Sequence, residues 1–149
     1  MIGSKEDIIK IVEIIADKIE NLVKKSIGRE LPITYLTIFS HNTHEYACFI
    51  EWSNQLGAQS EANNGLKFLL NKPIQTNSGI ITNIRIRKPD PYRSQIGCAD
   101  VYTEDYDLFR AEELPKYPDN LRLIERPEYD MIEFFDFDSN DVLAYITSK

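Results

Sequence analysis

Residues 80–102 read Ile-Ile-Thr-Asn-Ile-Arg-Ile-Arg-Lys-Pro-Asp-Pro-Tyr-Arg-Ser-Gln-Ile-Gly-Cys-Ala-Asp-Val-Tyr, and the order of elements on both sides follows from this segment. Apolar and polar residues alternate in its first third, which is typical of a strand with one buried face. Ile84 and Ile86 share one face there, while Asn83, Arg85 and Arg87 lie on the other. Pro89 and Pro91 have no N–H to donate to a sheet, so they predict a connector followed by a second strand.

The strand after the connector carries Cys98, Asp100 and Tyr102 on one face. A similar order of elements occurs on both sides of the connector, so we interpret the chain as two copies of one β-α-β unit. The first copy, residues 32–91, predicts strands at 33–39, 66–70 and 80–87, a helix ending near 57, a loop at 59–65, a break at 72–73 and a possible extra strand around 73–75. The second copy, residues 92–149, predicts strands at 96–102, 121–125, 131–135 and 142–147 and a helix at 105–114.

Residues 1–31 precede the repeat and predict an amphipathic helix. Apolar residues recur at helical spacing from Ile8 to Val23, with Ser4 as a start signal and Gly28 as a stop signal. We expect this helix to pack across the repeated part; the alternative is a homodimer contact. The whole chain, residues 1–149, is expected to form one domain.

Composition restricts the class of protein. With 149 residues, 42% of them hydrophobic, the chain can bury a substantial core. A formal charge of −7 argues against nucleic-acid and anionic-membrane binding, although residues 85–93 form a local basic island. Cys48 and Cys98 have no disulfide or metal-binding spacing, and no apolar run reaches the roughly 20 residues of a membrane span. A cytoplasmic protein is expected.

Two short segments of the second copy carry a family resemblance. They are Val-Tyr-Thr-Glu-Asp at residues 101–105, at a helix start, and Phe-Asp-Phe-Asp-Ser-Asn at residues 135–140, before the last strand. They resemble the vicinal oxygen chelate superfamily, which includes glyoxalase I, extradiol dioxygenases and bleomycin-resistance proteins. Residues 78–89 and the connector into 95–102 look most like its YecM-type branch. The resemblance covers residues 33–149 and implies an α+β, glyoxalase-like fold: an N-terminal helix plus two paired βαβββ modules whose curved mixed sheet encloses a cup.

The resemblance also implies where the superfamily holds its divalent metal, through His or Gln on the first strand and Glu near the last strand of each module. These places fall on Tyr35, Cys98, Arg85 (or Arg87) and Leu143. A guanidinium cannot bind a cation, and leucine offers no donor atom. We therefore predict no metal cofactor; the alternative is a divalent metal held by other residues.

The residues themselves predict a site for a small anionic molecule inside the cup. A guanidinium removed from water needs an anionic partner, and its planar fork suits a carboxylate or a phosphate. The alternative is an internal network of arginine and Asp100 that satisfies itself. The predicted lining residues are Tyr35, Thr37, Arg85, Arg87, Cys98, Asp100, Tyr102 and Tyr145.

Several other residues of the sequence could have either a chemical role or a purely structural one. His41 and His44 could bind a metal, but they fit better as exposed residues at a helix start. Cys98 could be a nucleophile, but a small buried hydrophobe is the better interpretation. Glu133 could face inward and act as a general base. Residues 136–141 superficially resemble a calcium loop, yet they lack its central glycine and terminal glutamate, so a solvated hairpin tip is predicted.

The sequence therefore predicts a vicinal-oxygen-chelate-like protein that binds a small anionic molecule without the family metal. The alternative function is that of a metal-dependent lyase, isomerase or dioxygenase of the same superfamily, so the sequence leaves both an enzyme and a binding protein as alternatives. A third class is an interaction protein that dimerises through its N-terminal helix or a sheet edge.

Overall fold

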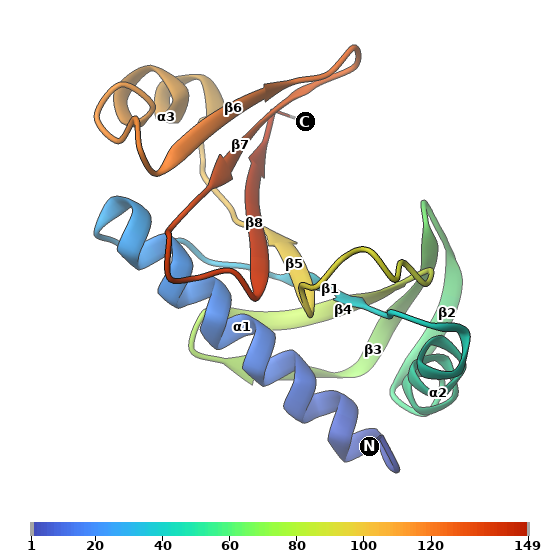
Figure 1. The fold of residues 1–149 in the computed structure, drawn as a ribbon. Coiled ribbons are helices and arrows are strands. Elements are labelled where there is room, and N and C mark those ends of the chain that lie inside the picture. The colour runs from blue at the N-terminus through green and yellow to red at the C-terminus, as the bar shows by residue number, and fades with distance from the viewer. Residues whose placement is uncertain (1, 149) are drawn as a thin grey trace.

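The structure, a computed structural model, describes residues 2–148. Within these residues the chain contains three helices and eight strands (Figure 1). In chain order they are α1 (Lys5–Ile27), β1 (Tyr35–Phe39), α2 (Thr43–Ser53), β2 (Gly57–Ala62), β3 (Gly65–Thr76), β4 (Gly79–Arg87), β5 (Gly97–Asp100), α3 (Tyr106–Glu113), β6 (Leu121–Glu125), β7 (Asp130–Phe134) and β8 (Val142–Thr147).

The strands form one mixed sheet in the order β2-β3-β4-β1-β5-β8-β7-β6. The two halves of this order repeat each other, because β1 pairs in parallel with β4 just as β5 pairs in parallel with β8. The halves meet where β1 and β5 run antiparallel, with Thr37 opposite Cys98. The predicted α+β architecture of two paired βαβββ modules is confirmed.

Helix α1 lies across both modules and packs against strands of each of them (Figure 1). Its apolar side faces the sheet and is almost completely buried from Ile8 to Ile27, as the helical spacing predicts. Gly28 ends the helix in a left-handed conformation, with its N–H donating to the carbonyl of Lys24. Burying one isoleucine contributes roughly 1.5–3 kcal/mol, so this stripe supplies much of the common core.

The alternation in β4 decides which face of the sheet is buried. Ile84 and Ile86 are fully buried on the face covered by α1, and Arg85 projects from the opposite face. In β5, Gly97 and Ala99 are buried in the same way, while Cys98 and Asp100 project oppositely. The concave face of the sheet, away from α1, therefore receives the polar side chains that the sequence singled out.

Two predictions about the first module are wrong. Residues 59–65 are not a loop, because β2 and β3 pair as a hairpin that turns at Asn63 and Asn64. Residues 72–73 do not break the chain, because β3 continues through Pro73 to Thr76. The pairing with β4 shifts register between Leu69 and Ile74, and such an irregularity tolerates a proline without N–H. β2 is a sheet edge, so its polar sequence shows no strand-like alternation.

No helix within residues 2–148 is long and apolar enough to span a membrane.

Candidate functional site

The two modules enclose a hollow of about 240 Å³ on the concave face of the sheet. The central strands β1, β4, β5 and β8 form its floor, and β7 borders it. Its lining comprises Tyr35, Thr37, Arg85, Cys98, Ala99, Asp100, Tyr129, Met131, Tyr145 and Thr147. The seam between β1 and β5 thus brings together side chains from both ends of the repeated part, such as Tyr35 and Thr147.

Six predicted site residues meet in this hollow, and two do not line it. Arg87 follows Arg85 along β4 but stacks over the ring of Phe39, at 5.0 Å, and pairs with Asp90 of the connector at 3.5 Å. Tyr102 lies beyond the end of β5, where the strand alternation no longer applies. Its side chain is 58% exposed, and it borders a different surface hollow beside α3.

Arg85 is fixed in place without an anionic partner from residues 2–148. Its Nε–H donates to Thr37 Oγ1 at 3.1 Å, and Nη1 donates to the carbonyl of Asn63 at 3.1 Å. Thr37 is buried, and Asn63 sits in the β2–β3 turn, so two separate elements orient the guanidinium. No carboxylate of residues 2–148 lies within 4.0 Å of it. The remaining N–H groups are free to bind an anion.

Asp100 is paired with a tyrosine and not with the guanidinium. Tyr35 donates its hydroxyl to Asp100 Oδ2 at 3.3 Å. Burial raises the pKa of Asp100, while the Tyr35 hydrogen bond and the charge of Arg85 act in the opposite direction. The arginine–aspartate contact considered as an alternative is therefore not formed directly, although the two charges influence each other across the hollow.

Two other titratable side chains of the hollow, Cys98 and Tyr145, have raised pKa values. Burial raises the pKa of the Cys98 thiol, and the nearby Arg85 only partly offsets this effect. Burial, followed by the charge of Glu133, raises the pKa of Tyr145 to about 12. A protonated thiol is a weak nucleophile, so this environment favours the interpretation of Cys98 as a packing residue.

The superfamily's metal chemistry does not fit these residues. The register places Thr37 opposite both Arg85 and Cys98, and Cys98 opposite Leu143. This row across four strands thus contains a cationic guanidinium and a leucine at two of the places where the resemblance would require metal ligands. Within residues 2–148, no three His, Cys, Asp or Glu side chains are grouped to hold a metal ion.

His41 and His44 do not converge on a common point. His41 has a hydrogen-bond acceptor at each ring nitrogen: Glu45 Oε1 lies 2.8 Å from Nδ1, and the Gln95 carbonyl lies 2.9 Å from Nε2. Both nitrogens can donate only when the ring is protonated. His44 instead contacts Cys48 Sγ at 3.8 Å. His41 therefore links the start of α2 to the segment before β5.

This link predicts a pH-dependent contribution to stability. Burial lowers the pKa of His41, but hydrogen bonds to Gln95 and Glu45 outweigh burial and leave the pKa above its usual value. A raised folded-state pKa stabilises the protein below the unfolded value of about 6.5. This stabilisation is lost as the pH rises through the folded value.

We expect His41→Ala to lower the free energy of unfolding more at about pH 5.5 than at about pH 8.5. Urea unfolding at the two pH values measures the difference, and His44→Ala serves as the control because its ring has no carboxylate partner within residues 2–148. An equal loss at both pH values would show that the ring is not protonated in the folded state.

The sequence missed the part of the lining that comes from β7, from the residue before it and from the end of β8. Tyr129, Met131 and Thr147 border the hollow, because Met131 lies opposite Thr147 on the concave face. The alternation along β7 and β8 does place Met131 and Thr147 on one face of the sheet. Only the curvature of the sheet, which the sequence does not show, turns that face toward the hollow. Glu133, predicted to face inward, does face the concave side and pairs with Arg122 of β6.

Residues 136–141 form a turn closed by their own hydrogen bonds. The N–H groups of Asp138 and Ser139 donate to the side chain and the carbonyl of Asp136, respectively. Asp141 pairs with Lys18 of α1 at 2.8 Å. This ion pair thus links the β7–β8 connection to α1.

Comparisons with known proteins bear on the fold. No protein-family model matches the sequence, and a search of curated proteins found no match. A structural-genomics protein designated EC4020 superposes with a TM-score of 0.60 at 12% identity, over 98% of this chain and 92% of that one. This similarity shows a shared fold and says nothing about activity.

Two weaker similarities are to methylmalonyl-CoA epimerases. The Streptomyces coelicolor enzyme in complex with 2-nitronate-propionyl-CoA gives a TM-score of 0.46 at 12% identity, over 80% of this chain and 97% of that one. A methylmalonyl-CoA epimerase in complex with methylmalonyl-CoA and NH4+ gives 0.44 at 13% identity, over 80% and 94%. Both scores are too low to support an argument about function.

Proposed function

We propose that this chain is a vicinal-oxygen-chelate-like protein that binds a small anionic molecule through Arg85, without the metal of that superfamily. The observation that carries the proposal is the half-buried guanidinium of Arg85, held by Thr37 and Asn63 and unpaired among residues 2–148. A bidentate carboxylate or phosphate would supply the missing partner.

The size and walls of the hollow limit the ligand. A volume of about 240 Å³ corresponds to roughly eight waters at about 30 Å³ each, so a short carboxylic acid or a phosphate fits. Tyr35 and Tyr145 provide flat apolar walls with polar tips. Asp100 beside them would repel a second negative group when ionised. The expected ligand is therefore small and carries one anionic group.

Two sources support the superfamily part of the proposal. The short segments at 101–105 and 135–140 resemble its motifs, and the paired βαβββ architecture agrees with the fold that this resemblance implies. We assign the chain to the YecM-type branch on the resemblance of residues 78–102. We also propose a cytoplasmic location, for which the unpaired thiols of Cys48 and Cys98 are suited.

Two measurements on the purified protein test this proposal. A thermal-shift screen of short carboxylates and phosphate should raise the midpoint of unfolding, because a ligand that binds only the folded state stabilises it. Metal analysis should find no stoichiometric zinc, nickel, manganese or iron. Stoichiometric metal would favour the alternative of a metal-dependent lyase, isomerase or dioxygenase, and a screen without hits would refute anion binding.

A further inference from the structure

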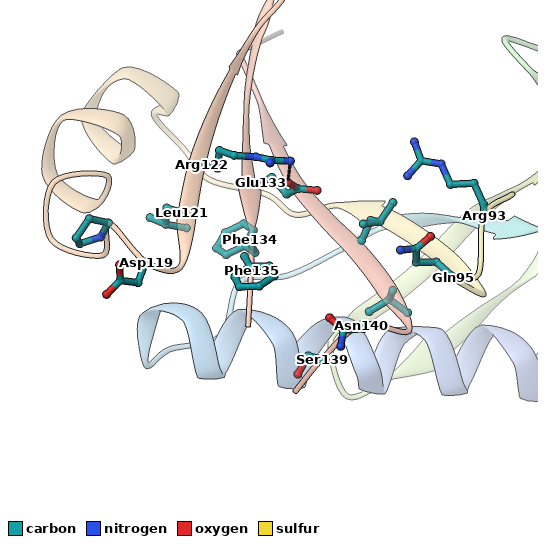
Figure 2. A pocket seen from close by; sticks show the side chains of 13 residues that line it. Arg93, Gln95, Asp119, Leu121, Arg122, Glu133, Phe134, Phe135, Ser139 and Asn140 are labelled. Carbon is teal, nitrogen blue, oxygen red and sulfur yellow. Dashed lines mark hydrogen bonds and ion pairs between the residues drawn. The ribbon is translucent and has the colours of Figure 1, made fainter. Parts of the chain in front are cut away.

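A second, larger hollow lies beside the first on the concave face of the sheet. It has a volume of about 550 Å³ and shares no lining residue with the Arg85 hollow. The connector before β5, the strands β6 to β8 and the turn at residues 136–141 enclose it (Figure 2). Its size is that of ordinary small-molecule sites. The proposed function does not use it.

Arg93 provides a positive charge on one side of this hollow. Its side chain extends from the connector toward the space above β8 (Figure 2). It forms no ion pair within the described residues, 2–148. Its charge also lowers the pKa of Tyr145, against the larger effects of burial and Glu133. Arg93 therefore lies near the wall between the two hollows and is free to bind an anionic group.

Glu133 provides a negative charge on another side. Its side chain is only 14% exposed, whereas that of its ion-pair partner Arg122 is 70% exposed. Arg122 contacts the Oε1 atom of the carboxylate (Figure 2). The Oε2 atom accepts no hydrogen bond from the rest of residues 2–148. A carboxylate that is mostly removed from water and only half satisfied favours a ligand that donates a charged hydrogen bond.

Apolar side chains also line this hollow. Leu121, Val142 and Leu143 line the hollow together with Phe134 and the half-exposed Phe135. A ligand suited to this surface carries an anionic group, a cationic donor and an apolar body. We propose that the larger hollow binds an apolar amino acid, with its carboxylate on Arg93, its ammonium group on Glu133 and its side chain against Leu143 and Phe135.

Three related small molecules test the carboxylate contact and the ammonium contact separately. Phenylalanine carries both charged groups, 3-phenylpropionate lacks the amine, and phenethylamine lacks the carboxylate. Dissociation constants from amide chemical-shift titrations should be at least about fivefold lower for phenylalanine than for either analogue, since each lost charged contact weakens binding. The shifted amides should belong to residues around the larger hollow, such as Gln95 and Leu143.

Single substitutions test which side chain of the hollow binds each charged group of phenylalanine. Arg93→Ala should weaken phenylalanine about tenfold and leave phenethylamine unchanged, whereas Glu133→Gln should weaken both and leave 3-phenylpropionate unchanged. Arg126→Ala, an exposed arginine at the far turn, is the control for Arg93. Arg122→Ala removes a guanidinium that also lines the hollow but keeps the Glu133 carboxylate, so phenylalanine should still bind to this variant. Amide spectra of each variant confirm that it folds.

Two results would overturn this proposal: phenylalanine that shifts no amide around the larger hollow, or phenylalanine binding that survives both Arg93→Ala and Glu133→Gln. Arg85→Ala separates the two sites, because it should abolish anion binding in the smaller hollow and leave phenylalanine binding intact. Loss of phenylalanine binding in Arg85→Ala would place the amino acid in the smaller hollow and would also contradict the proposal.

Discussion

Replacing Arg85 with alanine should abolish the thermal stabilisation that carboxylates and phosphate give the wild-type protein. The guanidinium is already oriented by Thr37 and Asn63, so binding costs little side-chain ordering. Loss of a bidentate charged contact costs about 3 kcal/mol, a factor of about 150 in the dissociation constant. Isothermal titration with the best carboxylate from the screen measures this factor.

Arg87→Ala is the matched control for this experiment. Arg87 lies on the same strand and the same face, but its charge is paired with Asp90 and its guanidinium stacks over Phe39. Its removal should leave the dissociation constant within about twofold of wild type, a difference of roughly 0.4 kcal/mol. Equal losses in both variants would indicate that the basic island attracts anions in general and that the hollow has no special role.

Replacing Gly97 with alanine should strongly destabilise the protein, because this residue lies where the two modules and α1 meet. A Cβ atom at Gly97 would lie 2.4 Å from the carbonyl oxygen of Thr37 and 2.7 Å from Ile15 Cδ1. The first contact is with backbone of the neighbouring strand, which cannot move without disturbing the β1–β5 pairing. We expect the free energy of unfolding to fall by at least about 2 kcal/mol.

Urea unfolding measures this loss, and Gly3→Ala provides the control. The nearest atom to a Cβ at Gly3 is an Asp7 carboxylate oxygen 3.9 Å away, so that substitution should change the free energy of unfolding by less than about 0.5 kcal/mol. A Gly97→Ala protein as stable as wild type would mean that the two modules do not approach each other as closely at β1 and β5 as the structure indicates.

The sequence was sufficient to predict which residues are buried where a strand or helix has one buried face. Ile84 and Ile86 of β4 and the apolar stripe of α1 are buried as their spacing predicts, because each element presents one side to a common core. The same argument identified Arg85, Cys98 and Asp100 as residues of the opposite face. Their meeting in one hollow followed from the repeat, which the β1–β5 pairing confirms.

The sequence did not predict the structure correctly where both faces of a strand are exposed. It also did not predict which residues the curvature of the sheet brings together. β2 is an edge strand, so its polar residues gave no periodic signal. Tyr102 was placed by extending the alternation of β5 two residues beyond its end at Asp100. Arg93 and Glu133 face one hollow although they lie on a connector and an outer strand, and no local pattern relates such positions.

The Arg85 guanidinium lines the hollow between the two paired modules, and we propose that it binds an anion there. Nuclear magnetic resonance of the arginine Nε–H groups during a titration with the best carboxylate tests this claim most directly. We expect the Arg85 resonance to shift and to saturate with the dissociation constant found by calorimetry, while the Arg87 resonance stays in place. An Arg85 resonance that remains unchanged while the protein is saturated with ligand would contradict it.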